Sequence, residues 1–270
     1  MIKNYLFILF AILISINIYA QTKKTHYSNG NLKTEGKLLN NKKTGIWKIY
    51  YKNGNLAAIQ SYKNNKKTGL SKLFHKNGKL KQIGKFENDK LIGLWKYFDE
   101  SEYILQTQRY INGKQTGIIK HYFKNGKIEK FGFAENRRTY GIWKVYYKNG
   151  ALFQIGELNN GIQHGKWKMY HRNGKLFTVG HFENGKQTKK WHTYDTLGNL
   201  NSIETYKKGI KNGLCKMFHL NGKLLAVGQI LNGKQTGEWR VFFENGEFHK
   251  TSIYKEGELI NKIPSIIKKQ

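Results

Sequence analysis

The chain has 270 residues, and its 48 lysines and arginines outnumber its 17 aspartates and glutamates, which gives a formal net charge of +31. Its 29 glycines argue against a helical protein, because each glycine in a helix interior costs about 1 kcal/mol relative to alanine. An aromatic content of 14 % is too high for a disordered basic tail, and the single cysteine excludes an intrachain disulfide or a multi-cysteine metal centre.

Residues 1–20 have the pattern of a secretory signal peptide. Lys3 supplies a short positive start, residues 5–19 are apolar apart from Ser15 and Asn17, and Ala20 precedes Gln21 at the expected cleavage position. This apolar run is shorter than the roughly 20 residues that a membrane-spanning helix needs. We therefore predict cleavage between Ala20 and Gln21, an exported protein (periplasmic, outer membrane-associated or secreted) and no transmembrane span in the mature chain. An uncleaved membrane anchor is the alternative.

A 24-residue repeat accounts for the chain after this segment. One series of eight Asn-Gly pairs begins at positions 29, 53, 77, 125, 149, 173, 221 and 245, and every gap within this series is 24 or 48 residues. A second glycine column with the same period runs from Gly45 to Gly237, with Lys189 as its one departure. A third column starts at Gly36 and is filled in four copies by other polar residues, namely Gln60, Gln108, Glu204 and Ser252. We assign residues 21–260 to an array of about ten repeats and residues 261–270 to a C-terminal cap or tail.

Each repeat is predicted to contain two strands and two turns. The residues before each Asn-Gly pair, such as 46–52, are rich in β-branched and aromatic types and lack a helical period. Asn-Gly between two such runs is typical of a β-hairpin with a type I′ turn, in which both turn residues have positive φ. A second turn, such as Asn112-Gly113, ends the return strand. The predicted fold is all-β: tandem 24-residue β-hairpin repeats form an elongated, open antiparallel meander sheet of about twenty short strands.

The cysteine and three of the histidines occupy repeat columns, and this indicates structural roles for them. Cys215 occupies a column that is otherwise mostly tryptophan, and His75, His171 and His219 share the column of Tyr51. Histidines two copies apart would lie about 19 Å from each other, too far to share a metal ion. We therefore predict that the chain is not an enzyme and has no catalytic residues, no metal site and no cofactor.

Residues 141–156, with the sequence Gly-Ile-Trp-Lys-Val-Tyr-Tyr-Lys-Asn-Gly-Ala-Leu-Phe-Gln-Ile-Gly, resemble the bacterial variant of the MORN repeat. Tandem copies of this pattern, which cover roughly residues 26–260, resemble the YwqK-like antitoxin family. The resemblance implies β-hairpin repeats stacked into an open, curved sheet that serves as a binding or scaffolding surface. It also adds an antitoxin-like neutralising role to the functions to consider.

The positive charge is arranged in rows that follow the repeat. The position after the tryptophan column is basic in eight of nine copies, and these residues are candidate contacts for an anion or a protein partner: Lys48, Lys72, Lys96, Lys120, Lys144, Lys168, Lys216 and Arg240. The tryptophans beside them are further candidates, because aromatic rings stack on sugars and bases: Trp47, Trp95, Trp143, Trp167, Trp191 and Trp239. A solvated face that prevents sheets from aggregating is the alternative explanation of the lysines.

These patterns predict a non-catalytic scaffold that presents an extended basic and aromatic surface for protein–protein interaction outside the cytoplasm. The alternatives are a binder of an anionic envelope glycan or lipid through the lysine rows, and an antitoxin-like neutralising protein. The export signal argues against nucleic acid as the partner, and we expect a monomer. Alternation along Trp47, Lys48 and Tyr50 places the lysine row on the same side as the Tyr50 row, but it leaves open which face of the sheet is buried.

Overall fold

The computed structural model describes residues 20–264, and every secondary-structure element in that range is a β-strand. The strands are β1 (Gln21–His26), β2 (Leu32–Leu39), β3 (Lys42–Tyr50), β4 (Leu56–Lys63), β5 (Lys66–Phe74), β6 (Leu80–Glu87), β7 (Lys90–Phe98), β8 (Ile104–Ile111), β9 (Lys114–Gln115), β10 (Ile118–Tyr122), β11 (Ile128–Glu135), β12 (Arg138–Tyr146), β13 (Leu152–Asn159), β14 (Ile162–Tyr170), β15 (Leu176–Glu183), β16 (Lys186–Tyr194), β17 (Leu200–Lys207), β18 (Ile210–Phe218), β19 (Leu224–Leu231), β20 (Lys234–Phe242), β21 (Phe248–Lys255) and β22 (Glu258–Pro264). No helix within residues 20–264 is long and apolar enough to cross a membrane.

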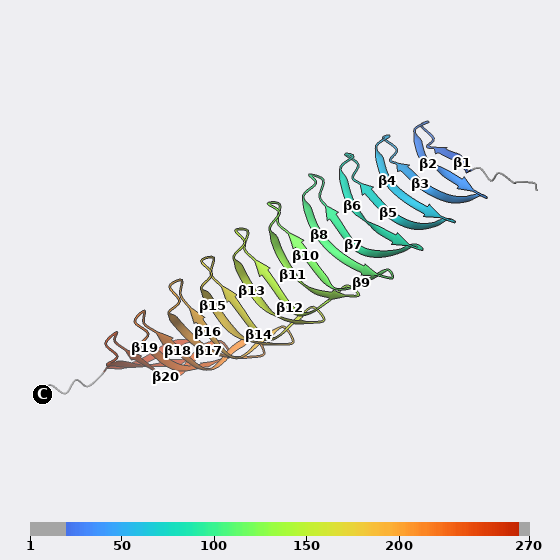
Figure 1. The fold of residues 1–270 in the computed structure, drawn as a ribbon. Coiled ribbons are helices and arrows are strands. Elements are labelled where there is room, and N and C mark those ends of the chain that lie inside the picture. Colours follow the sequence, from blue (N-terminus) through green and yellow to red (C-terminus); the bar gives the residue numbers. More distant parts are fainter. Residues whose placement is uncertain (1–19, 265–270) are drawn as a thin grey trace, which may run out of the picture.

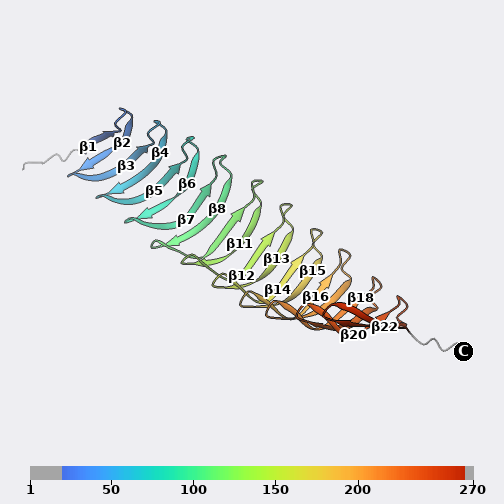
Figure 2. The same ribbon diagram turned by 180° about the vertical axis from the view of Figure 1, so that it is seen from behind.

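These strands form one 22-stranded antiparallel sheet, in which neighbours in the sequence are neighbours in space. The one interrupted position lies beside β8, which pairs with both β9 and β10 on either side of Thr116–Gly117. Figures 1 and 2 show a long, curved ribbon whose order from end to end follows the order of the sequence. The predicted all-β open meander is confirmed.

Of the two predicted boundaries of the repeat array, the one at 20/21 lies at the edge of the described residues, and the one at 260/261 lies within them. The predicted signal peptide lies outside them, apart from the exposed Ala20, and Gln21 begins β1. At the other end, β22 crosses the predicted boundary at 260/261 and pairs with β21 as far as Pro264, which lies opposite Lys250. Residues 261–264 are therefore the end of the last strand of the sheet.

The turns that contain the eight Asn-Gly pairs of the 24-residue series from position 29 to position 245, which we call near turns, do not have the predicted type I′ conformation. In the near turn at 51–55, only Gly54 has positive φ, at 89°, and its N–H donates to the Tyr51 carbonyl at 2.9 Å. Five residues separate the paired Tyr50 and Leu56, and a loop of this length closes with a type I turn followed by a left-handed glycine. The type I′ prediction for the Asn-Gly pairs of the near turns was therefore wrong.

The turns at the other ends of the strands, which we call far turns, have the conformation expected of type I′. Asn64 and Asn65 have φ of 51° and 66°, and they connect the paired residues Lys63 and Lys66. A two-residue connection favours a primed turn, because its twist matches that of the flanking strands. Asparagine and glycine fill most far-turn positions because they tolerate positive φ best.

Side chains of the near turns tie each repeat to the next one. The Tyr51 hydroxyl donates to the Phe74 carbonyl at 2.7 Å, and the Asn53 amide donates to the Lys76 carbonyl at 3.4 Å. His75, in the same column as Tyr51, makes the corresponding contact through Nε2 at 3.1 Å. These bonds explain why asparagine precedes the turn glycine although it does not have positive φ.

The buried core lies on one side of the sheet, which we call the tryptophan face. Its six tryptophans are between 0 and 6 % exposed. Each indole lies against a glycine eleven residues earlier, so closely that a Cβ at Gly84 would overlap the ring of Trp95. Phe86 packs edge-on against the same indole, with ring centroids 5.2 Å apart. The third glycine column therefore exists because tryptophan occupies the space above it.

Three copies have no tryptophan in this column, and each of them also lacks the glycine. Their pairs are Gln60 with Ser71, Gln108 with Ile119, and Glu204 with Cys215. We call these positions polar rungs and the six Gly–Trp positions tryptophan rungs. In one polar rung, the fully buried Gln108 accepts a hydrogen bond from the Gln115 amide at 2.7 Å. The longer side chain therefore supplies, from the neighbouring strand, volume that the indole supplies elsewhere.

Candidate binding surface

The lysine row lies on the side of the sheet opposite the buried tryptophans, and we call this side the lysine face. Lys48 follows the buried Trp47 and pairs in register with Ile59 on β4. The Lys48 ammonium, at 3.3 Å, and the Tyr50 hydroxyl, at 3.0 Å, both contact the Glu35 carboxylate. The predicted placement of the lysine row beside the Tyr50 row is confirmed. Only one of the two aromatic rows is buried, because the Tyr50 row stays partly exposed on the lysine face.

The predicted basic residues form one line across this face, which we call the lysine line. None of its eight members is buried: Lys48, Lys96, Lys168 and Arg240 are exposed, and Lys72, Lys120, Lys144 and Lys216 are half-buried. Each stands between two neighbouring strands, as Lys72 stands between Ile59 and Ile83. Successive members are two strands apart, about 9.6 Å. The stems can cover aliphatic neighbours while the ammonium groups reach water.

Most of this charge is not neutralised within the part of the chain that the structure describes. Residues 20–264 contain two ion pairs, Lys48 with Glu35 and Lys211 with Glu204, and only the first involves the lysine line. The hydrogen bond from the Tyr50 hydroxyl, assisted by Lys48, lowers the pKa of Glu35, so this carboxylate stays ionised. The rest of the line is a strip of positive charge that faces solvent.

The tryptophans do not take part in this surface, and their prediction as contact residues was wrong. Their rings point to the other face of the sheet, where the backbone of the glycine column lies against them. The Trp47 indole donates to the Lys37 carbonyl at 3.2 Å, and the Lys43 ammonium lies 4.4 Å from the ring centroid. A partner that approaches the folded sheet finds no indole face to stack on.

The cysteine and the histidines take structural places. Burial raises the pKa of the Cys215 thiol to about 11, so the side chain is a protonated thiol at neutral pH. His75, His171 and His219 each place Nε2 within 3.1 Å of a carbonyl of the following repeat. Among the residues that the structure describes, no group of three or more histidine, cysteine or carboxylate side chains could hold a metal ion.

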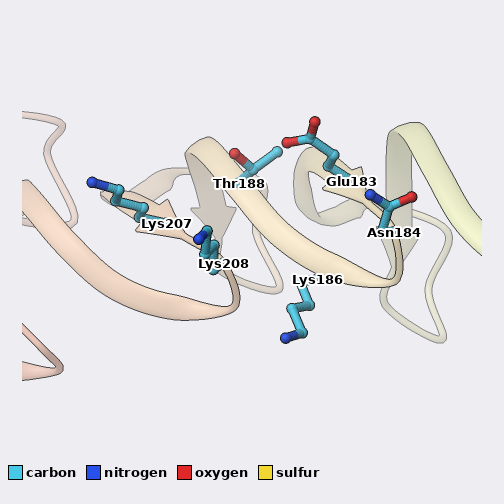
Figure 3. Close-up of a pocket in the computed structure, with 6 residues that line it drawn as sticks. All are labelled: Glu183, Asn184, Lys186, Thr188, Lys207 and Lys208. Atoms are coloured by element: carbon cyan, nitrogen blue, oxygen red, sulfur yellow. The ribbon is translucent and has the colours of Figure 1, made fainter.

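A surface depression of about 540 Å³ lies beside β16, between the far turns on its two sides. It is lined by Glu183, Asn184, Lys186, Thr188, Lys207 and Lys208. Figure 3 shows the amines of Lys186 and Lys207 pointing away from each other and from the carboxylate of Glu183. The side chains do not converge on a common point, so the depression has the form of a gap between solvated turns.

A second set of residues on the lysine face was missed by the sequence analysis. Two positions before each lysine of the first five full copies stands an aliphatic side chain that is 44 to 62 % exposed, and we call this set the apolar line: Ile46, Leu70, Leu94, Ile118 and Ile142. In later copies the same column holds Lys166, Lys190, Leu214 and Glu238. The column is visible in the sequence, but its exposure depends on which face of the sheet is buried.

Comparison with known proteins identifies the repeats. The family described as MORN repeat variant matches residues 43–64, 67–88, 139–160, 163–184 and 211–232. No protein of curated function matches the chain.

Weak similarity to solved structures involves parts of much longer chains. A crystal structure of TcdB2-TccC3 matches with 10 % identity over 90 % of this chain and 15 % of that chain, at a TM-score of 0.21. The Tc holotoxin pore of Photorhabdus luminescens matches with 11 % identity over 86 % of this chain and 15 % of that chain, at a TM-score of 0.19. This chain thus spans about 15 % of the length of those chains, and no inference about it rests on them.

Proposed function

This chain is a MORN-repeat protein, and on that premise we propose that it is a non-catalytic scaffold that presents its lysine face to a protein partner outside the cytoplasm. The observation that supports the proposal is the difference between the two faces of the sheet. The tryptophan face holds the rungs together, whereas the lysine face carries exposed charge and exposed aliphatic side chains that the fold does not use.

An open single sheet suits a binding role. Side chains on the lysine face lie in rows with a fixed spacing, and these rows cover many rungs. Such a surface provides many shallow contacts to a long partner, as the concave surfaces of other repeat proteins do. The signal-like pattern of residues 1–20 supports the proposed location outside the cytoplasm.

A second candidate function is the binding of an anionic envelope glycan or lipid. The lysine line favours it, because its charges are evenly spaced and almost all lack an acidic neighbour among residues 20–264. Contacts of this kind weaken steeply with salt, since exposed charges are screened over a few ångströms at high ionic strength. Salt dependence therefore separates the two candidates.

The test is a capture experiment with the purified full-length chain and an envelope extract, at about 0.15 M and about 0.5 M salt. A lysine-line variant replaces four residues together: Lys72→Gln, Lys96→Gln, Lys120→Gln and Lys144→Gln. The matched control removes the same charge from four exposed far-turn lysines: Lys42→Gln, Lys66→Gln, Lys90→Gln and Lys114→Gln. Circular dichroism checks that both variants keep the sheet.

The scaffold proposal expects one protein to be retained at both salt concentrations by the wild type and the control, because exposed aliphatic side chains share the contact, and to be retained less by the lysine-line variant at about 0.15 M salt. Glycan or lipid retained only at low salt would favour the second candidate. Capture that is equal for both variants would refute a role for the lysine face.

A further inference from the structure

The apolar line is a strip of aliphatic side chains that crosses five strands of the sheet at one position: β3, β5, β7, β10 and β12. Each of its members lies two residues from a member of the lysine line, and therefore on the same face at about 6.8 Å along the strand. A single exposed aliphatic side chain needs no explanation. Five of them in register on alternate strands make a row of exposed aliphatic side chains, with Ser61, Lys85 and Arg109 on the strands between the first four, and such a row is a candidate binding site.

The fold itself does not require this strip. Later copies build the same hairpins with Lys166, Lys190 and Glu238 in the column, and these strands pair with their neighbours in the same register. Apart from Leu214, which is flanked by Lys190 and Glu238 in this column, the apolar residues lie together in the first half of the array, and sheet stability is not the reason for that grouping. Binding of another molecule over the strip would explain these residues, because it would remove their aliphatic surface from water. We call that molecule the cover.

The charge around the strip defines what the cover must carry. The lysine line runs along one side of it, and return strands place Lys85 opposite Leu70 and Arg109 opposite Leu94. One return strand places an acid, Glu157, opposite Ile142 at the end of the strip, so the cations outnumber it. None of these cations is in an ion pair within residues 20–264, apart from Lys48 with Glu35. The cover is therefore acidic as well as apolar. Glycans lack the aliphatic side chains that would cover such a strip, so a polypeptide fits better.

The centre of the strip is hollowed where the sheet is irregular. Between β9 and β10, Gly117 has a φ of 81°, and a depression of about 610 Å³ opens on the lysine face. Its lining includes the aliphatic Leu94 and Ile118 and the cations Lys96, Arg109 and Lys120. A partner that places an aliphatic side chain and a neighbouring carboxylate in this depression would find apolar contacts for the first and cations for the second.

The spacing of the rungs favours one backbone conformation for the cover. Members of the strip recur every two strands, about 9.6 Å. A polyproline II segment rises about 9.3 Å in three residues, whereas an α-helix rises about 10.5 Å in seven. Over the four steps of the strip, the accumulated mismatch is about 1 Å for polyproline II and about 4 Å for the helix. An extended segment therefore stays in register with the strip.

We propose that the apolar line and the neighbouring part of the lysine line bind an extended acidic segment of a partner protein, with one aliphatic and one acidic side chain every three residues. This assignment rests on the scaffold function proposed above and names the chemistry of the segment that the lysine face recognises. The segment lies across the strands, so that its aliphatic side chains meet the apolar line and its carboxylates meet the lysines.

The first test measures fluorescence anisotropy of a labelled peptide of five Leu-Pro-Glu units titrated with the purified full-length chain. The variant Leu94→Gln/Ile118→Gln removes the centre of the apolar line at exposed positions, and Lys166→Gln/Lys190→Gln is the matched control in the same column. We expect the Kd to rise at least about tenfold in the first variant and less than about twofold in the control.

The second test compares two double variants within the lysine line. Lys96→Gln/Lys120→Gln removes the cations that line the depression, whereas Lys168→Gln/Lys216→Gln removes equal charge from copies beyond Ile142. We expect a Kd increase of about tenfold for the first pair and about twofold for the second, because only the first pair lies beside the strip.

Four results would overturn the assignment. Equal losses in the matched variants would mean diffuse attraction by charge. Tighter binding of an acidic heptad peptide that forms a helix would exclude the extended conformation. Binding of phosphatidylglycerol vesicles that depends on Leu94 and Ile118, with no peptide binding, would make the occupant a membrane. If a protein is captured from the envelope extract regardless of Leu94→Gln/Ile118→Gln, this assignment fails while the scaffold function stands.

Discussion

Two adjacent rungs of the tryptophan face solve the same packing problem in different ways. In one, the Trp95 indole lies flat on the bare backbone of Gly84 and is fully buried. In the next, Gln108 replaces the glycine and Ile119 replaces the tryptophan. The side-chain oxygen of Gln108 accepts a hydrogen bond from the Gln115 amide. The comparison teaches that the two positions on adjacent strands change together: glycine occurs with an indole, and a longer side chain occurs with a smaller partner.

The largest loss of stability is expected when the indole of a tryptophan rung is removed. We expect Trp95→Ala to lower the free energy of opening β7 by about 3–5 kcal/mol, because it deletes a large side chain from a close-packed site. Native-state hydrogen exchange measures this opening locally, which suits an array that can unfold in parts. The control is Lys96→Ala on the opposite face, for which we expect a change within about 0.5 kcal/mol. An unchanged β7 in Trp95→Ala would contradict the packing role.

Adding a methyl group under the indole is the next largest change. We expect Gly84→Ala to destabilise the same rung by about 1–3 kcal/mol, because the new Cβ would overlap Trp95. Urea denaturation followed by tryptophan fluorescence measures the loss. The same substitution in a Trp95→Leu background should be milder, since leucine leaves the space above position 84 open. Equal costs in both backgrounds would argue that backbone effects dominate.

A polar rung can be converted into a tryptophan rung. We expect Ser71→Trp alone to be destabilising, because Gln60 occupies the space that the indole needs. Adding Gln60→Gly should recover stability, with a coupling energy of about 1–3 kcal/mol in a double-mutant cycle. Additive effects of the two substitutions would show that the paired volumes are unrelated.

A smaller gain is expected from Ser71 itself. Its buried hydroxyl has no hydrogen-bond partner among residues 20–264, and an unpaired buried hydroxyl is unfavourable. Ser71→Ala should therefore raise stability by about 0.5–1 kcal/mol in urea denaturation. Thr107→Ala serves as the comparison, because the Thr107 hydroxyl lies 3.3 Å from the Tyr122 hydroxyl and would lose that contact. A loss of stability in Ser71→Ala would point to a partner for this hydroxyl.

The smallest effect concerns the thiol in the third polar rung. Burial raises the pKa of Cys215 to about 11, so the native state holds this proton more tightly than the unfolded chain does. We expect iodoacetamide to label native Cys215 slowly at pH 8 and faster as the pH rises toward 11, whereas the urea-unfolded chain is labelled quickly at pH 8. Mass spectrometry reads the extent of labelling. Fast labelling of the native chain at pH 8 would contradict burial.

Much of the fold and part of the candidate surface could be predicted from the sequence. The 24-residue spacing of Asn-Gly pairs and the alternation along each strand are local signals, and they indicated the all-β meander and the regular lysine line. The turn conformation was predicted wrongly, because five residues lie between the paired ends of the near hairpins and this length selects another turn. The length of a loop is known only once the strand register is known.

The sequence by itself determined the repeat, the strand class and the order of the rungs, because these depend on neighbouring residues. Only the tertiary structure decided which face is buried, since Trp47 and Tyr50 are both aromatic and lie on opposite faces of one strand. The deciding contact is with a glycine eleven residues earlier on an adjacent strand, which brings the backbone against the indole. That contact removed the tryptophans from the candidate surface and left the apolar line exposed beside the lysines.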